Sequence, residues 1–327
     1  MRQLPGMPAV AGVFLVMAAV SGVRSSAVAQ GYPEKPVMLV VPWPAGGSTD
    51  VVMRAIAESA AKHLGQPIVV DNKPGGNGTL GPAVMAASAM SDGYTIAQIP
   101  SSVWRLPLMQ KMTYDALKDF TYIVQLTGYT FGITTRADGP FKSWQEVVAF
   151  AKDNPGKVTY ASPGASSLLY IGMEQIAADA GIQLTHVPFK GGAETNAAVL
   201  GGHTMLQADS SGWKPLVDAG QLRLLAIWTA DRSKNWPDAP TLNELGYPFV
   251  FDAPFGVAGP KGMQADVVQK LHDAFKKAIE DKSVIEMMAK YDMVPRYLDM
   301  IAYRRAVEVS IESERPTLEK LGLARKD

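Results

Sequence analysis

Short apolar runs alternate with stretches of helical period along the first third of the chain. Residues 37–41, VMLVV, are rich in β-branched side chains and have the length of a strand that is buried on both faces. An apolar stripe at helical spacing begins at residues 51–56. A strand at 67–70, a helix at 82–89 and a strand at 94–99 follow, so the order predicted is βαβαβ. This order is typical of a parallel sheet with helices on both faces.

Residues 42–50, PWPAGGSTD, join the first predicted strand to the first predicted helix. Two prolines end the strand, two glycines leave the turn free of Cβ atoms, and three residues that can cap a helix follow. Unpaired N–H groups at a helix start favour an anionic ligand. Taken alone, the same residues also fit an ordinary βα turn with a good cap.

The same design returns in the second half of the chain. Residues 158–161 have the pattern of a strand, and the small-residue loop at 162–167 leads into a helix. Strands predicted at 185–189 and 204–208 end in Lys190 and Asp209. Two such α/β units predict a two-lobed protein with a cleft between the lobes, because ligands of these sheets bind beyond the carboxyl ends of the strands.

Two further apolar segments are expected to cross between the lobes, near residues 121–135 and 222–230, and to act as hinges. The predicted domain one is discontinuous and covers residues 30–127 and 228–327. The predicted domain two covers residues 128–227.

Composition excludes several classes of function. The 327 residues carry 31 basic and 31 acidic side chains, so no basic excess indicates a nucleic-acid partner. The chain has no cysteine, which excludes disulfides, thiol catalysis and cysteine-ligated metals. Its four histidines are too scattered to form a zinc motif. We therefore expect neither a metal nor a cofactor.

The N-terminus has the features of an export signal. Arg2 precedes an apolar run at 9–20 that is too short for a membrane span, and Ala27 and Ala29 form a small-x-small cleavage site. We expect residues 1–29 to be a signal peptide and the mature protein to be a soluble periplasmic monomer. A buried N-terminal helix is disfavoured, since neither caps nor an amphipathic pattern accompany the run.

Motifs of catalysis are missing from the sequence. It contains no Gly-x-Ser-x-Gly elbow, no P-loop and no His-Glu-x-x-His pair. We predict that the protein is not an enzyme. The alternative is an exported hydrolase acting on a small acid or ester, and a scaffold or adhesion domain is a third class.

Several segments together resemble the Bug-type solute receptors of tripartite tricarboxylate transporters. They are PWPAGGSTD (42–50), VVDNKPGGNGTLG (69–81), SDGYT (91–95), YDALKDF (114–120), PGKVTYASPGASS (155–167), HVPFKGG (186–192) and LRLLAIWTADR (222–232). The resemblance implies a type II, Venus-flytrap binding protein in which each lobe is a mainly parallel sheet flanked by helices. It also implies a receptor that captures a small carboxylate and delivers it to the membrane permease subunits of such a transporter. Dicarboxylates, tricarboxylates, amino acids and aromatic acids such as phthalate-like compounds all remain open as ligands.

The resemblance also implies a set of ligand-binding residues from both lobes. They are Trp43, Pro44, Ala45, Gly46, Gly47, Ser48, Asp50, Ser162, Gly164, Ala165, Ser166, Ser167, Lys190, Gly191 and Asp209. Lys190 fits a ligand contact and a solvated position equally well. The side chains that read the far end of the ligand are left open among Trp104, Arg105, Trp213 and Phe255.

Overall fold

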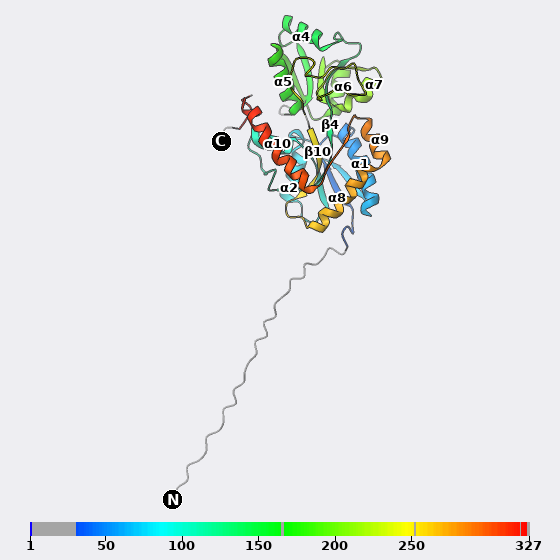
Figure 1. Ribbon diagram of the computed structural model, residues 1–327, viewed down its shortest axis with the longest axis vertical. Coiled ribbons are helices and arrows are strands. Elements are labelled where there is room, and N and C mark those ends of the chain that lie inside the picture. Colours follow the sequence, from blue (N-terminus) through cyan, green and yellow to red (C-terminus); the bar gives the residue numbers. More distant parts are fainter. Residues whose placement is uncertain (2–30, 165–166, 252, 321, 326–327) are drawn as a thin grey trace. The chain divides into compact units, whose positions relative to one another are not determined.

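The computed structural model describes Met1 and residues 31–164, 167–251, 253–320 and 322–325 (Figure 1). The predicted signal peptide therefore falls outside the described residues, apart from Met1. The chain divides into two units, Met1–Gly31 and Tyr32–Asp327, and the second unit carries every helix and strand described below.

The first sheet has six strands in the order β11-β4-β10-β3-β1-β2. Its strands are β1 (Val37–Val41), β2 (Ile68–Asn72), β3 (Thr95–Pro100), β4 (Phe120–Tyr129), β10 (Ala253–Pro260) and β11 (Pro295–Leu298). β2, β1 and β3 are parallel, whereas β10, β4 and β11 pair antiparallel. We call this sheet and its helices lobe one.

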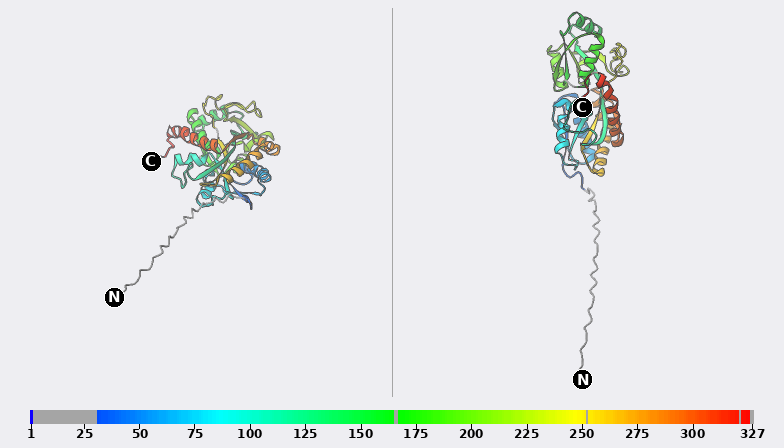
Figure 2. Two further views of the ribbon diagram at one scale, coloured as in Figure 1. Left: turned by 60° about the horizontal axis from the view of Figure 1, so that its bottom comes forward. Right: turned by 90° about the vertical axis from the view of Figure 1, so that its left-hand side faces the viewer.

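The helices of lobe one cover both faces of the sheet. They are α1 (Ser48–Leu64), α2 (Leu80–Ser88), α3 (Ser102–Met109), α8 (Ala265–Glu280), α9 (Lys282–Ala289) and α10 (Met300–Lys320), with the 3-10 turn η1 (Gly76–Gly78) before α2. α1 packs with α8 and α9 (Figures 1 and 2), and α10 packs with α3. The crossovers through α1 and α2 run in opposite directions along the sheet, so right-handed connections place these two helices on opposite faces.

The second sheet has five strands in the order β7-β6-β8-β5-β9. Its elements are β5 (Phe131–Arg136), α4 (Trp144–Asp153), β6 (Val158–Pro163), α5 (Leu168–Ala180), β7 (Leu184–Phe189), α6 (Gly192–Leu200), β8 (Leu206–Ser210), η2 (Ser211–Trp213), α7 (Lys214–Asp218) and β9 (Leu222–Ile227). β7, β6 and β8 are parallel, and β5 pairs antiparallel with β8 and β9. We call this sheet and its helices lobe two.

The predicted α/β fold with two sheets is confirmed, and each sheet is mixed rather than mainly parallel. The parallel strands are those of the predicted βαβαβ units. Antiparallel pairing arises at the connections between the lobes, where β4 leads into β5 across Thr130 and residues 228–252 join β9 to β10; β11 is added beside β4 later in the chain. A chain that leaves lobe one for lobe two and later returns enters lobe one from the opposite end. The returning strand β10 therefore runs antiparallel to β3.

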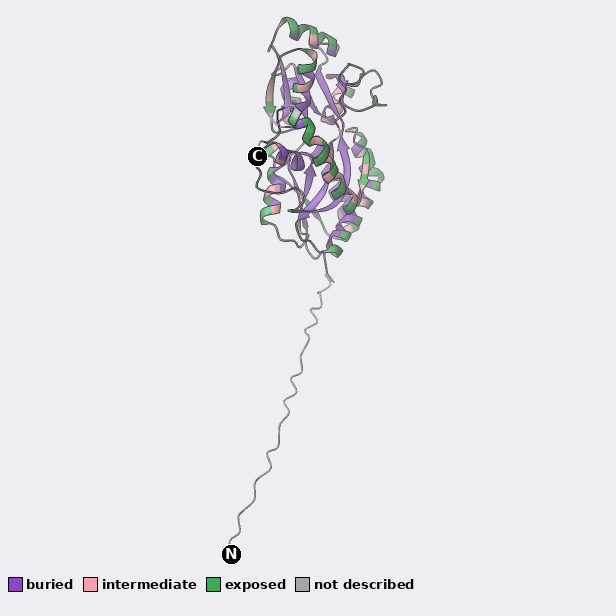
Figure 3. Cartoon of the chain, turned by 60° about the vertical axis from the view of Figure 1, so that its left-hand side comes forward, coloured by how far each residue is buried: buried purple, intermediate pink, exposed green. Residues whose placement is uncertain are grey.

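Apolar side chains fill both lobes, and the outward faces of the helices are exposed (Figure 3). In lobe one Val40, Ile99, Trp104 and Tyr303 belong to one core cluster. Among the described residues, no helix is long and apolar enough to cross a membrane, and no three side chains are grouped to hold a metal ion.

Candidate functional site

A cavity of about 70 Å³ lies beyond the carboxyl ends of parallel strands from both lobes. Its wall is formed by Trp43, Pro44, Gly47, Ser48, Thr49, Asn77, Pro100, Ser101, Ser102, Arg105, Tyr129, Phe131, Pro163, Ser167, Leu168, Leu169, Gly192, Asp209, Ser210 and Ala253. The position follows from topology. The order β2-β1-β3 reverses direction between β1 and β3, and the order β7-β6-β8 does so between β6 and β8. Such switch points leave a crevice that binds ligands, and here both open into one cavity.

The start of α1 contributes backbone donors to the cavity wall. Its N-cap is Gly47, which has an extended backbone (φ −72°, ψ 164°) and no side chain to accept a hydrogen bond. The first N–H groups of a helix have no partner within the helix, and Ser48 and Thr49 line the cavity at this point. The helix start therefore offers N–H groups and the positive end of its dipole to the cavity.

Asp50 stabilises the turn between β1 and α1 and is not part of the cavity wall. Its carboxylate accepts hydrogen bonds from the Gly46 N–H at 2.9 Å, from Arg54 Nε at 2.9 Å and from Asn72 Nδ2 at 2.8 Å. Burial acts to raise the pKa of Asp50, but the hydrogen bonds from Arg54, Gly46 and Asn72 outweigh it and lower the pKa below its ordinary value. Asp50 is thus charged and fully engaged.

The start of α5 in lobe two is capped by a side chain. Ser167 Oγ accepts a hydrogen bond from the Tyr170 N–H at 3.1 Å and donates one to the Gly164 carbonyl at 3.1 Å. Ser167 lines the cavity, but its hydroxyl already has two protein partners. This helix start consequently offers less free hydrogen-bonding capacity than that of α1.

Asp209 brings a buried carboxylate to the wall at the end of β8. It is 2% exposed and accepts hydrogen bonds from Thr195 Oγ1, from the Ser210 N–H at 2.6 Å and from Ser210 Oγ at 3.2 Å. Among the described residues it forms no ion pair with a lysine or arginine. Burial raises the pKa of Asp209 to about 6, although the hydrogen bonds from Thr195 and Ser210 oppose the shift. A Cβ atom on Gly192, the first residue of α6, would lie 3.4 Å from Asp209 Oδ2, so the carboxylate lies close to the start of that helix.

The start of α3 adds a second polar region to the lobe-one wall. Arg105 is 3% exposed; its Nε and Nη2 donate to the two oxygens of Glu314 at 2.5 and 3.0 Å, and its Nη1 donates to Ser101 Oγ at 3.3 Å. Ser102 Oγ is buried and has no hydrogen-bond partner among the described residues. The wall also includes the apolar side chains of Phe131, Leu168 and Leu169.

The structure brings together six of the residues predicted from sequence. Trp43, Pro44, Gly47, Ser48, Ser167 and Asp209 all line the cavity. Two others, Ala165 and Ser166, lie outside the described residues. The remaining seven are not part of the cavity wall: Ala45, Gly46, Asp50, Ser162, Gly164, Lys190 and Gly191.

The predicted residues that do not line the cavity are kept from it for different physical reasons. Ala45, Gly46 and Lys190 are exposed. Ser162 is fully buried, and its Oγ lies 2.8 Å from His186 Nε2. Gly191 packs under Pro44, where an added Cβ would approach Pro44 Cδ to 2.8 Å.

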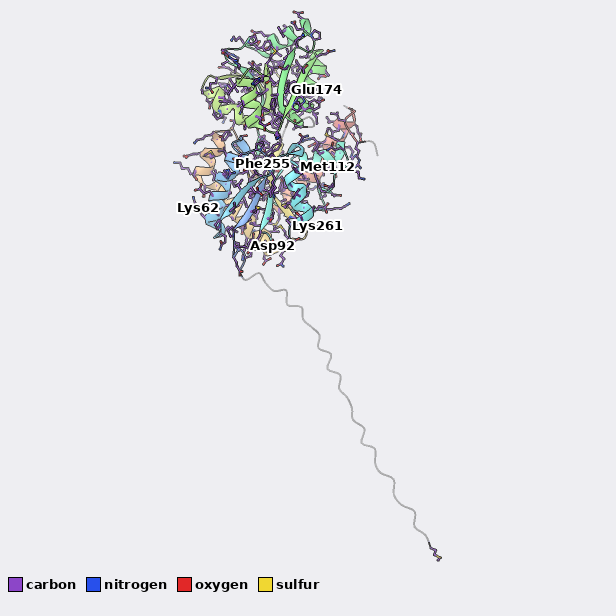
Figure 4. All side chains as sticks on the ribbon, turned by 180° about the vertical axis from the view of Figure 1, so that it is seen from behind. Lys62, Asp92, Met112, Glu174, Phe255 and Lys261 are labelled. Carbon is purple, nitrogen blue, oxygen red and sulfur yellow. The ribbon has the colours of Figure 1, made fainter. Side chains whose placement is uncertain are left out.

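Sequence reasoning missed most of the wall contributed by β3, α3 and the strands between the lobes. The residues not predicted are Thr49, Asn77, Pro100, Ser101, Ser102, Tyr129, Phe131, Pro163, Leu168, Leu169, Gly192, Ser210 and Ala253, while Arg105 had been left open. Trp104, Trp213 and Phe255, also left open, are core residues with 0–1% exposure and do not line the cavity. Figure 4 labels Phe255 within the first sheet. The switch-point rule applied to β3 would have found Pro100, Ser101 and Ser102.

Comparison with known proteins identifies the family. The model of the "Tripartite tricarboxylate transporter family receptor" matches residues 52–323. The chain belongs to this receptor family. It is 46% identical over 317 residues to a UPF0065 protein in the gbd 5′ region of Cupriavidus necator, covering 96% of this chain and 97% of that protein. It is also 33% identical over 294 residues to BugT of Bordetella pertussis, with 88% of each chain covered.

Solved structures of similar proteins share the two-lobed fold of this receptor. The periplasmic binding protein BugD is 28% identical with a TM-score of 0.85, covering 90% of this chain and 100% of its own. MatC of Rhodopseudomonas palustris with bound malate is 27% identical with a TM-score of 0.80, covering 87% and 99%. R. palustris Rpa4515 with adipate is 26% identical with a TM-score of 0.84, covering 90% and 99%.

The receptor is a Bug-type periplasmic solute-binding protein and not an enzyme, as predicted. The hydrolase alternative finds no support in these relatives. Ser162 Oγ lies 2.8 Å from His186 Nε2, but this pair does not provide a nucleophile in the cavity, since Ser162 is fully buried and is not part of the wall.

Proposed function

We propose that this receptor captures a small carboxylate in the cavity between its lobes and delivers it to the permease of a tripartite tricarboxylate transporter. The observation that carries the proposal is the start of α1. Its cap, Gly47, has no acceptor of its own, and Ser48 and Thr49 present the first turn of the helix at the cavity wall. A carboxylate is the group that such a helix start stabilises.

The other lining residues support a small, partly apolar anion. Phe131 and Leu168 offer apolar contacts, and Trp43 Nε1 is already engaged by Gln98 Oε1 at 3.2 Å. The ligands of two similar structures, malate and adipate, are both dicarboxylates. From the predicted set we retain as ligand-binding the six residues that line the cavity, with the hydrogen-bond donors supplied by lobe one and the opposite wall by Ser167 and Asp209.

We further propose that the ligand is held by closure of the lobes. The two connections, at Thr130 and at residues 228–252, fall beside the predicted boundaries of domain one (30–127 and 228–327) and domain two (128–227). Wall residues come from both lobes, so full binding energy is available only when both contact the ligand. Small-angle scattering should show compaction at saturating ligand; an unchanged radius of gyration would contradict closure.

Export to the periplasm completes the proposal. The predicted signal peptide over residues 1–29 would be removed after Ala29, which leaves a soluble monomer beginning at Gln30. Mass spectrometry of the exported protein tests the cleavage, and an intact Met1 would contradict it.

Thermal-shift screening of purified receptor against a carboxylate library tests the function. A ligand at a hundred times its dissociation constant adds about 2.7 kcal/mol to the free energy of unfolding. Gly47→Val serves as the matched control, since its side chain would stand over the helix start. The proposal fails if no carboxylate stabilises the native receptor, or if every stabilising carboxylate acts equally on Gly47→Val.

A further inference from the structure

Asp209 is a buried acid in the cavity wall, on the lobe opposite the helix start that attracts the anion. We propose that Asp209 is a proton-binding site, which takes up a proton when the receptor captures its carboxylate ligand. Ligand and proton then enter the closed cavity together. This inference rests on the proposed function and adds a second bound species to it.

Two short contacts connect the start of α1 to Asp209 across the lobes. Ser48 Oγ lies 3.5 Å from Ser210 Oγ, and Ser210 Oγ lies 3.2 Å from Asp209 Oδ1. A carboxylate held by the first N–H groups of α1 therefore lies close to the carboxylate of Asp209. Two negative charges repel strongly in a closed cavity, because the protein interior screens them much less than water does. Protonation of Asp209 removes this repulsion.

The hydrogen-bond donors that the structure describes at Asp209 are all neutral. They are Thr195 Oγ1, the Ser210 N–H and Ser210 Oγ. Burial without a cation disfavours the charged form and raises the pKa of Asp209 to about 6. In the empty receptor Asp209 is therefore ionised at neutral pH, but a modest further rise in its pKa suffices to protonate it.

The hydroxyl of Thr195 lets the site accept a proton without losing a hydrogen bond. Thr195 Oγ1 lies within hydrogen-bond distance of two acceptors, Asp209 Oδ2 and the Gly192 carbonyl oxygen at 3.0 Å, and it has a single proton to donate. When Asp209 is ionised, Thr195 donates to the carboxylate. When Asp209 is protonated on Oδ2, the acid donates to Thr195 Oγ1, which then donates to the Gly192 carbonyl. Both protonation states are satisfied by the same atoms.

The other titratable groups on the elements around Asp209 leave the proton to this side chain. Tyr129 on β4 is a neutral phenol whose pKa is raised by burial and by Asp209, and its hydroxyl contacts Thr49 Oγ1. Asp179 and Lys190 are exposed. The remaining groups have described partners: Asp50 with Arg54, Arg105 with Glu314, Arg136 with Asp138, Tyr160 with Glu174, His186 with Ser162 and Tyr170, Glu194 with the Lys190 N–H, and Lys214 with Asp218. Of the acids among all these groups, none but Asp209 lines the cavity.

The direction of the pH dependence follows from the charge of the ligand. A bound anion raises the pKa of Asp209 further, so at pH values above about 6 the ligand-bound receptor holds more protons than the empty receptor. The affinity for the anion therefore rises as the pH falls toward this value. At lower pH Asp209 is protonated in both states, and its contribution to the affinity becomes constant.

Isothermal titration calorimetry in buffers of different ionisation enthalpy counts the protons. Succinate, adipate and phthalate serve as probes because all three are ionised near pH 7; if none of them binds, the carboxylate that raises the melting temperature most takes their place. Binding enthalpies in phosphate and Tris at about pH 7 should report the uptake of roughly half a proton or more for each ligand bound. Between about pH 6 and 8 the affinity should fall on the order of 10-fold.

Asp209→Asn reproduces the neutral form of the side chain. Its amide can donate to Thr195 Oγ1 and its oxygen can accept from the Ser210 N–H, so the fold should be kept, which circular dichroism checks. We expect no proton uptake in this variant and, at about pH 8, an affinity on the order of 10-fold higher than that of the native receptor. A gain of affinity distinguishes a proton site from simple damage to the cavity, which would weaken binding.

Asp292→Asn is the matched control. Burial also raises the pKa of Asp292, and its carboxylate accepts a hydrogen bond from Asn235 Nδ2, but Asp292 does not line the cavity. This variant should keep the proton uptake and the pH dependence of the native receptor.

Two outcomes overturn the proton site. One is native binding whose enthalpy does not depend on the buffer, as expected if Asp209 stays ionised and accepts a hydrogen bond from a ligand hydroxyl or ammonium group. The other is native-like proton uptake in Asp209→Asn. Both leave the proposed function standing, because a carboxylate is still bound. If no carboxylate binds to the native receptor, the proposed function itself fails and the proton site with it.

Discussion

The helix starts that meet at the cavity come from one design, but the two lobes use it differently. In lobe one, α1 begins with a glycine cap, so its first N–H groups remain available. In lobe two, Ser167 caps α5 and the carboxylate of Asp209 lies near the start of α6. The anion-binding capacity of a strand–turn–helix unit therefore depends on whether the cap brings its own acceptor.

This difference assigns different tasks to the lobes. Lobe one can supply backbone donors to a carboxylate without losing any hydrogen bond of its own. Lobe two already satisfies the start of α5 through Ser167, and the negative charge of Asp209 beside the start of α6 opposes a second anion nearby. Lobe two accordingly closes the cavity and shapes it, while lobe one provides the main electrostatic attraction.

A side chain placed at the free start of α1 should have the largest effect on carboxylate affinity. Gly47 has a φ of −72°, which valine adopts without strain, and an added Cβ would lie 3.5 Å from the Pro44 carbonyl oxygen, an ordinary contact. We expect Gly47→Val to fold normally but to lose carboxylate affinity by about 100-fold or more, because a branched side chain covers the donors. Calorimetry measures the affinity, and circular dichroism checks the fold.

Gly46 provides the contrasting variant for that experiment. Its φ of +82° lies in the left-handed region, which costs a residue other than glycine roughly 1–2 kcal/mol. Gly46→Val should therefore lower the melting temperature, which Gly47→Val should not. Normal carboxylate binding by Gly47→Val would refute the role of lobe one.

The buried charge of lobe two should appear as a pH-dependent stability. The pKa of Asp209 is about 6 in the folded protein against 3.8 for the ordinary group, so the folded state binds more protons between these values. The free energy of unfolding then falls as the pH rises from about 4 to 6, by roughly 3 kcal/mol in total from this group. Denaturant titrations at about pH 4.5 and 7.5 should show that the free energy of unfolding falls more steeply with rising pH in the native receptor than in Asp209→Asn. Parallel pH profiles of the two proteins would contradict this prediction.

The sequence predicted the parts of the fold that depend on local pattern. β1 with α1 and β6 with α5 follow from apolar periodicity and small-residue loops. Gly47, Ser48 and Ser167, which the resemblance implies as ligand-binding residues, stand in those loops and line the cavity. A pattern of apolar residues does not say which strand lies beside which. The antiparallel pairing of β10 with β3 and β4 therefore had to come from the structure.

The same reason explains the site residues that were missed. Tyr129, Phe131 and Ala253 reach the cavity because the strands between the lobes run past it. Arg105 is fixed by Glu314, which is 209 positions away in the chain. Asp50 looked like a cap and a ligand contact, but its turn is completed by Asn72 on the next strand. No local pattern contains these contacts.

Removing the cap of lobe two should have a moderate effect on stability and little on binding. Loss of the N-cap hydroxyl in Ser167→Ala should cost about 1 kcal/mol. Ser143→Ala is the matched control, since Ser143 Oγ caps α4 through the Glu146 N–H at 3.3 Å and does not line the cavity. Thermal unfolding should show similar losses for both variants. A loss of carboxylate affinity confined to Ser167→Ala, and as large as that of Gly47→Val, would show that lobe two holds the anion as strongly as lobe one.

The smallest effect is expected at Lys190, the one lysine among the residues predicted to bind the ligand. Its side chain is exposed and is not part of the cavity wall, and its backbone N–H donates to Glu194 Oε2 at 3.0 Å. An exposed cation outside the cavity contributes little to a specific contact, so Lys190→Met should change carboxylate affinity by less than about twofold. Calorimetry at low and high salt measures this, because any remaining effect of the charge should vanish at high salt. If Lys190→Met abolishes binding while Gly47→Val binds normally, a cationic side chain of lobe two dominates the site, and the assignment of attraction to the helix start of lobe one is wrong.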